Sequence, residues 1–393
     1  MNRALRFVSA LALSLPACRA RPPRAPTATA APVSSDCRRA IASELASTPL
    51  DDTVTWTCGD ASTCCPARAS DGRIALALVA VSDPPGEWSH MLSGAWFDRA
   101  RDAYLAVRDN DPGVVWMRPD PTFSHWTGGF TGIAVWPHGS LEAISGLGDG
   151  LVIADEEEGN VTPAGPHLFT TTLADAGLDA SARPLLRVPE RLARACENSG
   201  LESVSVTPDG RTLVASMERA LSGDAPGVAR VLVSDLASGT QRQRAWRLGP
   251  DCWNDDRPSD LGVSELVALS ADRALVLERS WRRAGGSCAR IYLADLARGD
   301  DVTDVTALTR ETRAIPKRLV LDLSTLPRDA GLEPAAGQTH PVLGNYEGMA
   351  LGPCMADGRR AVLLVTDDND DSVRARGGPP QARRALVLAA TGL

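Results

Sequence analysis

The chain of 393 residues is 44% hydrophobic and 23% charged, and its formal net charge is −8 at pH 7. Nothing in this acidic balance resembles the basic stripe of a nucleic-acid-binding protein, so we expect no nucleic-acid partner. An acidic chain favours cationic partners or bound metal ions instead.

Residues 1–17 have the anatomy of an export signal. Two arginines precede an apolar run over residues 7–15, which is shorter than the roughly 20 residues that cross a bilayer. The run ends at Leu15-Pro16-Ala17-Cys18, which resembles the lipobox of bacterial lipoproteins. We expect a lipid on Cys18, as the only membrane contact, and a place in the cell envelope (outer membrane or periplasm). The alternative is ordinary cleavage nearby, for example at Ala20, and secretion.

Two segments precede the main body. Residues 18–36 are rich in Pro, Ala, Thr and Ser, which predicts a flexible tether. Residues 37–65 form a cysteine-rich segment with one helical pattern at residues 37–46. Apart from Cys18, eight of the nine cysteines remain, and an even number in an exported chain favours disulfides over free thiols. They are Cys37, Cys58, Cys64, Cys65, Cys196, Cys252, Cys288 and Cys354, and their spacing does not choose a pairing.

Short apolar strands separated by Asp-Gly turns dominate residues 66–393. Four hairpins share one template: a glutamate begins the first strand, a turn follows, and the second strand ends on an acid. The starting glutamates are Glu142, Glu202, Glu265 and Glu347. The acids at the ends are Asp155, Glu218, Glu278 and Asp367. A degenerate fifth copy runs from Ser93 to Asp109, with Met91 where the glutamate is expected.

The repeated hairpins predict an all-β fold, a β-propeller that occupies residues 66–393. The hairpins recur at intervals of roughly 60 to 80 residues, which is too long for one bare blade each, so we expect about six blades. Further strand pairs lie between them, at residues 229–235 with 245–248 and at 290–296 with 318–323. A last strand at 382–389 would complete a blade begun at 73–81 and close the ring. A β-sandwich is the alternative, but it leaves the recurring acids unexplained.

The recurring acids predict a shared site. A single glutamate at a strand start is usually solvated, but the inner strands of a propeller converge on one channel. Two like charges 4 Å apart cost about 4 kcal/mol at an effective dielectric near 20. The acids therefore either raise their pKa values or bind cations. Oxygen ligands without His or Cys suit Ca²⁺ or Mg²⁺, so we expect these eight acids to bind calcium.

The segment Asp367-Asp368-Asn369-Asp370-Asp371 adds Asp368 to the candidate calcium ligands. It opens like an EF-hand loop but has Ser372 and Gly378 where that motif needs Gly and Glu. The chain has no G-x-S-x-G elbow and no H-E-x-x-H motif, and its five histidines are scattered. Metal-activated water is therefore the favoured attacking group in any hydrolysis.

Several blocks in a fixed order resemble a known bacterial family, the "esterase-like activity of phytase", or phytase-like, proteins. The blocks include Leu141-Glu-Ala-Ile144, Asn198-Ser-Gly-Leu-Glu202, Thr207-Pro-Asp-Gly-Arg211, Val263-Ser-Glu-Leu266, Lys317-Arg-Leu-Val320, Asn345-Tyr-Glu-Gly348 and Thr366-Asp-Asp-Asn369. The sequence departs from the family pattern at Ser203 and Asp370, and in its cysteines.

The resemblance implies a propeller and, by the family's name, hydrolysis of a phosphoester or ester in a small molecule. Arg219, Arg279 and Lys317 lie beside the shared blocks and are candidates for binding a phosphate. Three functions compete: a calcium-dependent phosphoester hydrolase, a metal-dependent lactonase or carboxylesterase, and a non-catalytic binding propeller of the envelope. Converging glutamates with cations beside them would favour the first.

Overall fold

A computed structural model gives the fold. It describes residues 51, 53–56, 65, 73–109, 113–132, 140–156, 166–174, 177–178, 183–195, 199–250, 260–282, 286–328, 331–335, 338–369 and 381–393. All of them belong to one compact unit, Ser35–Leu393. The expected signal, tether, Cys18 and helix at 37–46 lie outside these residues. Among the described residues, no helix has the length and apolar character that crossing a membrane requires.

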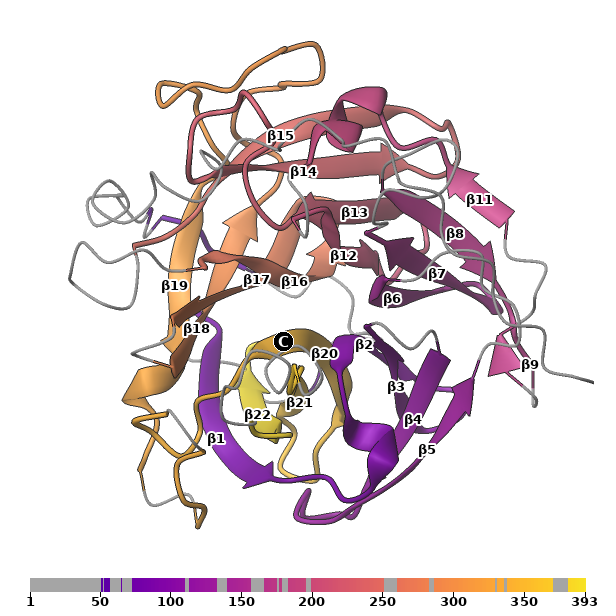
Figure 1. Cartoon of the computed structure of the whole chain (residues 1–393), viewed down its shortest axis with the longest axis vertical. Coiled ribbons are helices and arrows are strands. Elements are labelled where there is room, and N and C mark those ends of the chain that lie inside the picture. The colour runs from indigo at the N-terminus through magenta and orange to yellow at the C-terminus, as the bar shows by residue number, and fades with distance from the viewer. Residues whose placement is uncertain are drawn as a thin grey trace, which may run out of the picture. The chain divides into compact units, whose positions relative to one another are not determined.

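Five antiparallel sheets of four strands each form the blades of a propeller (Figure 1). Blade 1 contains β2 (Leu92–Asp98), β3 (Ala103–Arg108), β4 (Gly113–Pro119) and β5 (Trp126–Gly132). Blade 2 contains β6 (Leu141–Leu147), β7 (Gly150–Asp155), β8 (His167–Thr171) and β11 (Arg183–Leu186). Blade 3 contains β12 (Leu201–Val206), β13 (Thr212–Met217), β14 (Val228–Asp235) and β15 (Gln241–Arg247).

The other two blades complete the ring. Blade 4 contains β16 (Gly262–Ser270), β17 (Arg273–Arg282), β18 (Gly286–Asp295) and β19 (Lys317–Asp322). Blade 5 contains β20 (Tyr346–Cys354), β21 (Arg360–Thr366), β22 (Ala385–Thr391) and β1 (Ala75–Ser82). The remaining described elements are a small ribbon of β9 (Leu173–Ala174) and β10 (Gly177–Leu178), and the 3-10 turns η2 (Glu87–Ser89), η3 (Glu190–Arg194) and η4 (Leu323–Thr325).

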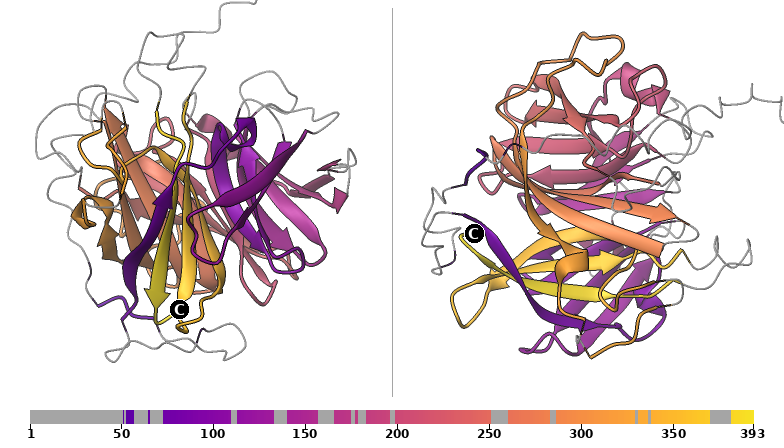
Figure 2. Two further views of the ribbon diagram at one scale, coloured as in Figure 1. Left: turned by 90° about the horizontal axis from the view of Figure 1, so that it is seen from below. Right: turned by 90° about the vertical axis from the view of Figure 1, so that its left-hand side faces the viewer.

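The innermost strands contact one another in cyclic order, β2 to β6, β12, β16, β20 and back to β2. This cyclic order excludes a sandwich. The predicted closure is confirmed: β1 pairs antiparallel with β22, from Ala75 opposite Thr391 to Ser82 opposite Ala385, and the two strands lie side by side in Figures 1 and 2. Cys65 is joined to Cys354, and Cys288 is also disulfide-bonded. The other five predicted disulfide cysteines lie outside the described residues.

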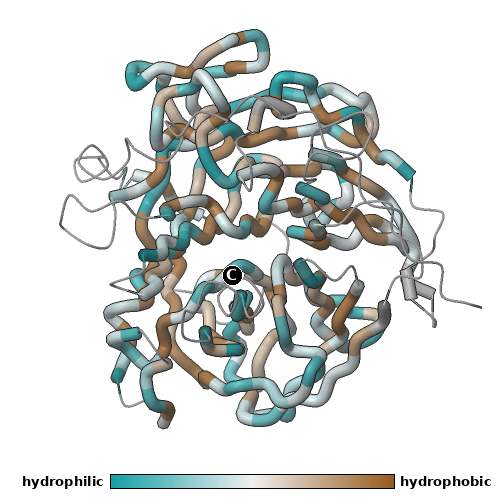
Figure 3. The backbone as a smooth tube through the Cα atoms, in the orientation of Figure 1, coloured by the Kyte–Doolittle hydropathy of each residue, from teal (hydrophilic) through white to brown (hydrophobic). Residues whose placement is uncertain are grey.

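Apolar side chains on both faces of the strands hold neighbouring blades together. In β21, Val362 and Leu364 pack in a cluster with blade 4, whereas Leu363 and Val365 pack in a cluster with blade 1. This alternation follows from the two-residue period of a strand. Burying one such side chain contributes roughly 1.5–3 kcal/mol, and Figure 3 shows the resulting apolar segments along the strands.

The expectation of about six blades is wrong, because there are five. Each template hairpin, including the degenerate copy, forms the two inner strands of one blade, and the two further strand pairs become the outer strands of blades 3 and 4. The long interval before the last hairpin comes partly from residues 296–316, between β18 and β19, which reach over to blade 3. There Val302 N donates to Gln243 O on the outer strand β15 (2.9 Å), and Ile315 N donates to Ala245 O (2.8 Å).

Candidate functional site

A β-bulge near the start of every inner strand defines the candidate site. In blades 2, 3 and 5 the bulged residue is Glu142, Glu202 or Glu347, each flanked by paired residues on both sides. The register shifts at the same place in blade 1, around Ser93, and in blade 4, at Ser264. A bulge leaves its extra residue out of the ladder and re-aims its side chain. Three of the predicted starting glutamates therefore occupy equivalent positions.

The same backbone contact recurs near the end of the second strand of each hairpin. In four blades the backbone N–H of an acid donates to the carbonyl two residues before the bulge position, at 2.9–3.1 Å. In blade 4 the corresponding pair is Gly262 and Arg279. The five equivalent residues are Asp109, Glu156, Glu218, Arg279 and Asp367. We call Glu142, Glu202, Glu347, Asp109, Glu156, Glu218 and Asp367 the central acid cluster.

The pairing register differs from the sequence template in two blades. Glu265 lies one residue beyond the bulge of blade 4, opposite Leu277, and Glu278 lies opposite Val263. In blade 2, Asp155 pairs with Leu141, so the equivalent acid is Glu156. A shift of one residue sends a side chain to the opposite face of a strand. Glu156 and Asp109 were missed as candidates, although counting from the bulge would have identified both.

Acids of the cluster that lie on different blades raise one another's pKa values. Burial raises the pKa of Glu142 well above its usual value, and the charges of Asp109 and Glu156 raise it further. The pKa of Glu202 is raised well above its usual value by burial and then by four acids of the cluster, of which Glu142 contributes most.

Glu347 and Asp367 belong to the same system of charges. Burial raises the pKa of Glu347 to about 6, although Arg279 acts in the opposite direction. The pKa of Asp367 rises well above its usual value through burial and through the charge of Glu347. The acids of blades 1, 2, 3 and 5 therefore form one electrostatic unit.

Few hydrogen bonds neutralise this cluster. Ser140 Oγ donates to Asp109 (3.0 Å) or to Glu142 (3.0 Å), and Ser93 Oγ lies 2.9 Å from Glu142. Asn345 Nδ2 donates to Glu347 (2.7 Å). Within the described residues, Glu218 Oε2 and Asn345 Oδ1 are buried without a hydrogen-bond partner. These two oxygens therefore lack a donor among the described residues.

Two of the three predicted phosphate-binding cations touch the cluster. Arg279 Nη2 lies 2.8 Å from Glu347 Oε1 and 3.5 Å from Glu218 Oε1. Arg219 Nη2 lies 2.7 Å from the same Glu218 oxygen, and its Nη1 lies 3.5 Å from Asp260. These two arginines therefore contact two acids of the cluster, Glu218 and Glu347.

Lys317 and Glu278 lie elsewhere, in the contact between blades 3 and 4. Lys317 Nζ is 2.5 Å from Glu278 and 4.5 Å from the centre of the Trp246 ring. Trp246 Nε1 and Gly249 N also donate to Glu278, at 2.8 and 2.9 Å. Both carboxylate oxygens of Glu278 are thus satisfied by protein donors, so this pair stabilises the contact between blades.

Three further acids that were predicted to bind calcium, Glu265, Asp368 and Asp155, lie outside the central acid cluster. Glu265 is 1% exposed and accepts from Leu266 N (3.0 Å) and Ala95 N (3.3 Å). Its pKa is raised by burial, with no acid of the cluster contributing. Asp368 binds His90 Nδ1 (2.7 Å), Met91 N (3.0 Å) and Arg383 Nε (2.9 Å). Asp155 is buried beside the cluster position, and residues 370–371 lie outside the described residues.

The donor set of the cluster fits a hard divalent cation, because it consists of carboxylate, amide and hydroxyl oxygens. The unpartnered oxygens of Glu218 and Asn345 are further potential ligands. Within the described part of the chain, no three acidic, histidine or cysteine side chains already stand in ligand geometry. A cation would therefore draw the carboxylates together from their present rotamers.

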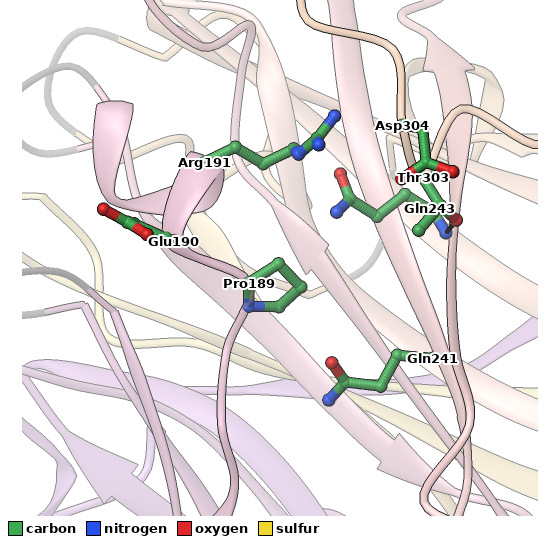
Figure 4. A pocket seen from close by; sticks show the side chains of 7 residues that line it. All are labelled: Pro189, Glu190, Arg191, Gln241, Gln243, Thr303 and Asp304. Atoms are coloured by element: carbon green, nitrogen blue, oxygen red, sulfur yellow. Dashed lines mark hydrogen bonds between the residues drawn. The ribbon is translucent and has the colours of Figure 1, made fainter.

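A pocket of about 740 Å³ lies at the outer edge of blade 3 (Figure 4). It is lined by Pro189, Glu190, Arg191, Gln241, Gln243, Thr303 and Asp304. None of these residues belongs to the central acid cluster. Gln241 Nε2 donates to Arg187 O (3.2 Å) and Arg191 Nη1 to Val305 O (2.7 Å), so much of this polar lining is engaged with the protein itself.

Comparisons with solved structures find weak similarities that extend over most of the chain. No curated protein matches the sequence. An endo-arabinase from Bacteroides thetaiotaomicron is 10% identical with a TM-score of 0.44, covering 78% of this chain and 96% of that one. A thermostable family-43 glycoside hydrolase is 11% identical with a TM-score of 0.42, covering 76% and 89%. Similarities of this size say nothing about activity.

The family comparison is more specific. Residues 87–370 match the phytase-like family, described as "esterase-like activity of phytase". The matched range begins just before blade 1 and ends just after the last acid of the central cluster, so it contains every residue of the candidate site. The chain belongs to the phytase-like family of β-propeller proteins.

Proposed function

We propose that this protein is a calcium-dependent hydrolase of small-molecule phosphoesters. The observation that carries the proposal is the central acid cluster, in which carboxylates from four blades meet at equivalent positions with two arginines beside them. Buried acids at such density either hold their protons or bind a counter-charge. A divalent cation supplies that charge and suits the oxygen donors.

The bulge residues Glu142, Glu202 and Glu347 are the proposed cation ligands, since they share one position on three inner strands. A bound divalent ion would supply a lowered pKa for water and a positive charge beside the scissile group. Asp367, whose pKa is raised by burial and by Glu347, is the proposed proton acceptor. A carboxyl with a raised pKa is the kind of base that works near neutral pH.

The two arginines favour phosphoesters over neutral esters. Arginine forms strong charge-assisted hydrogen bonds with phosphate oxygens, and Arg219 and Arg279 both contact the cluster through Glu218. A lactonase or carboxylesterase would need no such cations. A binding propeller without activity would need the cluster only as a structural clamp.

A substrate panel tests the proposal. Phosphomonoesters, phosphodiesters and aryl carboxylesters are incubated with the protein in calcium and in EDTA. We expect calcium-dependent phosphoester hydrolysis that falls at least about 100-fold in Glu202→Gln, in the range seen when one charge-stabilising group is removed from an active site. Glu265→Gln is the matched control, because Glu265 is equally buried but lies outside the cluster.

Each other outcome selects a different function. Calcium-dependent hydrolysis of aryl esters alone would identify a carboxylesterase or lactonase. Calcium binding without hydrolysis of any substrate would identify a binding propeller. Activity that is unchanged in EDTA would contradict the metal dependence.

The same proposal places the activity at the cell envelope, through a lipid on Cys18 that follows the apolar segment 7–15. Membrane fractionation of the wild type and of Cys18→Ser tests this placement. We expect the wild type in the membrane fraction and the variant in the soluble fraction. Equal fractionation of both, with an unmodified N-terminus, would indicate a secreted protein.

A further inference from the structure

Blade 4 breaks the pattern of the other four blades at the candidate site. Where blades 1, 2, 3 and 5 have an acid after the second strand, blade 4 has Arg279. Its bulge position holds Ser264, whose Oγ donates to Tyr346 O at 3.0 Å. The register therefore places a fixed positive charge among acids, at a position that the fold elsewhere gives to a carboxylate.

The contacts of Arg279 are those of a counter-ion. Its Nη2 lies within 3.5 Å of both Glu347 Oε1 and Glu218 Oε1. Its side chain is only 11% exposed, and Nε is buried without a hydrogen-bond partner among the described residues. Burial alone would lower the pKa of Arg279, but Glu347, Glu218 and Glu202 raise it. One guanidinium thus partly neutralises acids of two different blades.

The same carboxylates cannot serve Arg279 and a divalent cation equally well. Glu347 is a proposed cation ligand, and the unpartnered Oε2 of Glu218 is available beside it. Once both carboxylates are engaged by a cation, their charge is neutralised and the ion pairs of Arg279 weaken. The edge formed by Nε and Nη2 is then left with two parallel N–H donors, the geometry that binds a phosphate or carboxylate group in bidentate fashion.

We propose that Arg279 is an internal counter-ion for Glu347 and Glu218, and that cation binding frees it to bind the anionic group of the substrate. The inference rests on the proposed function, because it needs a cation at the cluster. Arg279 would then select substrates that carry an anionic group. Binding would also be ordered, because the cation has to bind before the anion. This role of Arg279 also accounts for the single blade that departs from the acidic pattern.

Calorimetric titrations with calcium chloride and with inorganic phosphate, below the concentrations at which calcium phosphate precipitates, test this order. In the wild type we expect phosphate to bind at least about tenfold more tightly with saturating calcium than in EDTA, a coupling within the usual range for linked sites. Arg279→Gln should bind calcium about tenfold more tightly, since the competing charge is gone, and should no longer bind phosphate. Arg279→Lys, which keeps the charge and protects the fold, should bind calcium like the wild type and phosphate more weakly.

Arg290→Gln is the matched control, because Arg290 forms a partly buried ion pair with Asp322 (2.8 Å) outside the cluster. It should change neither titration. Equal phosphate affinity with and without calcium, or unchanged calcium affinity in Arg279→Gln, would overturn the proposal while leaving a calcium-dependent hydrolase intact. A wild type that does not bind calcium would overturn the proposed function as well.

Discussion

Two regions of this propeller bury charge, and they do so in opposite ways. Between blades 3 and 4, Glu278 has Lys317, Trp246 Nε1 and Gly249 N as donors, and both of its oxygens are satisfied. In the central acid cluster, Arg219 and Arg279 contact Glu218 and Glu347, and Glu218 Oε2 has no partner in the described part of the chain. A satisfied buried acid stabilises packing, whereas an unsatisfied group of acids indicates a site for a ligand.

Breaking the satisfied pair should produce the largest change. Lys317→Met removes the cation and leaves the buried carboxylate of Glu278 without its counter-charge. We expect the free energy of unfolding to fall by about 3–5 kcal/mol, measured by urea denaturation. The double variant with Glu278→Gln should recover part of this loss. A loss below about 1 kcal/mol for Lys317→Met would show that the pair is not the structural element described here.

The unsatisfied cluster should respond to calcium instead. A ligand at a hundredfold excess over its Kd stabilises the folded state by about 2.7 kcal/mol, so calcium should raise the melting temperature and EDTA should lower it. The double variant of Glu202→Gln and Glu347→Gln keeps side-chain volume and should lose most of this response. A calcium response that survives both substitutions would locate the ion elsewhere, with the segment Asp367 to Asp371 as the next candidate.

The free energy of unfolding of the calcium-free protein should depend on pH because of the central acid cluster. The folded pKa of Glu347 is about 6, above its usual 4.5, so the folded state holds this proton more tightly than the unfolded chain. The resulting stabilisation is complete below pH 4.5 and is lost as pH rises through 6. The loss is about 2 kcal/mol, at 1.36 kcal/mol per pKa unit. Urea denaturation in EDTA between pH 4.5 and 7.5 should show a loss of at least this size, because other acids of the cluster also have raised pKa values, and Glu347→Gln should reduce it.

The smallest expected effect belongs to Glu265, which lies on an inner strand like three of the cluster acids but accepts from backbone N–H groups. Glu265→Gln should leave the calcium-induced rise in melting temperature unchanged within about 1 °C, since a small shift in stability moves the melting temperature of a protein of this size only slightly. Loss of the calcium response in this variant would place Glu265 in the site and end the distinction between it and the cluster.

The sequence predicted the hairpin unit, the closing pair of strands and three equivalent glutamates, because these depend on local patterns of apolar and turn residues. It did not predict the number of blades, since the long intervals between hairpins suggested a sixth blade, whereas residues 296–316 form a long connection that covers β15. Nor did it predict the register. A bulge adds one residue at Ser264, and no local pattern distinguishes Glu265 from the true equivalent. Whether an acid faces Lys317 or other acids depends on contacts between distant blades.

The pairing of β1 with β22 also bears on how this chain folds. Strand β1 has its hydrogen-bonding partner about 300 residues later in the sequence, in β22 from Ala385 to Thr391. The cost of closing a loop rises only slowly with its length, but pairings between distant segments make folding slow. The ring therefore closes only after β22 has been synthesised, and until then blade 5 lacks two of its four strands, β22 and β1. The Cys65–Cys354 bond, which spans 289 residues, ties the segment before β1 to the end of β20 and so adds a covalent link to the same blade.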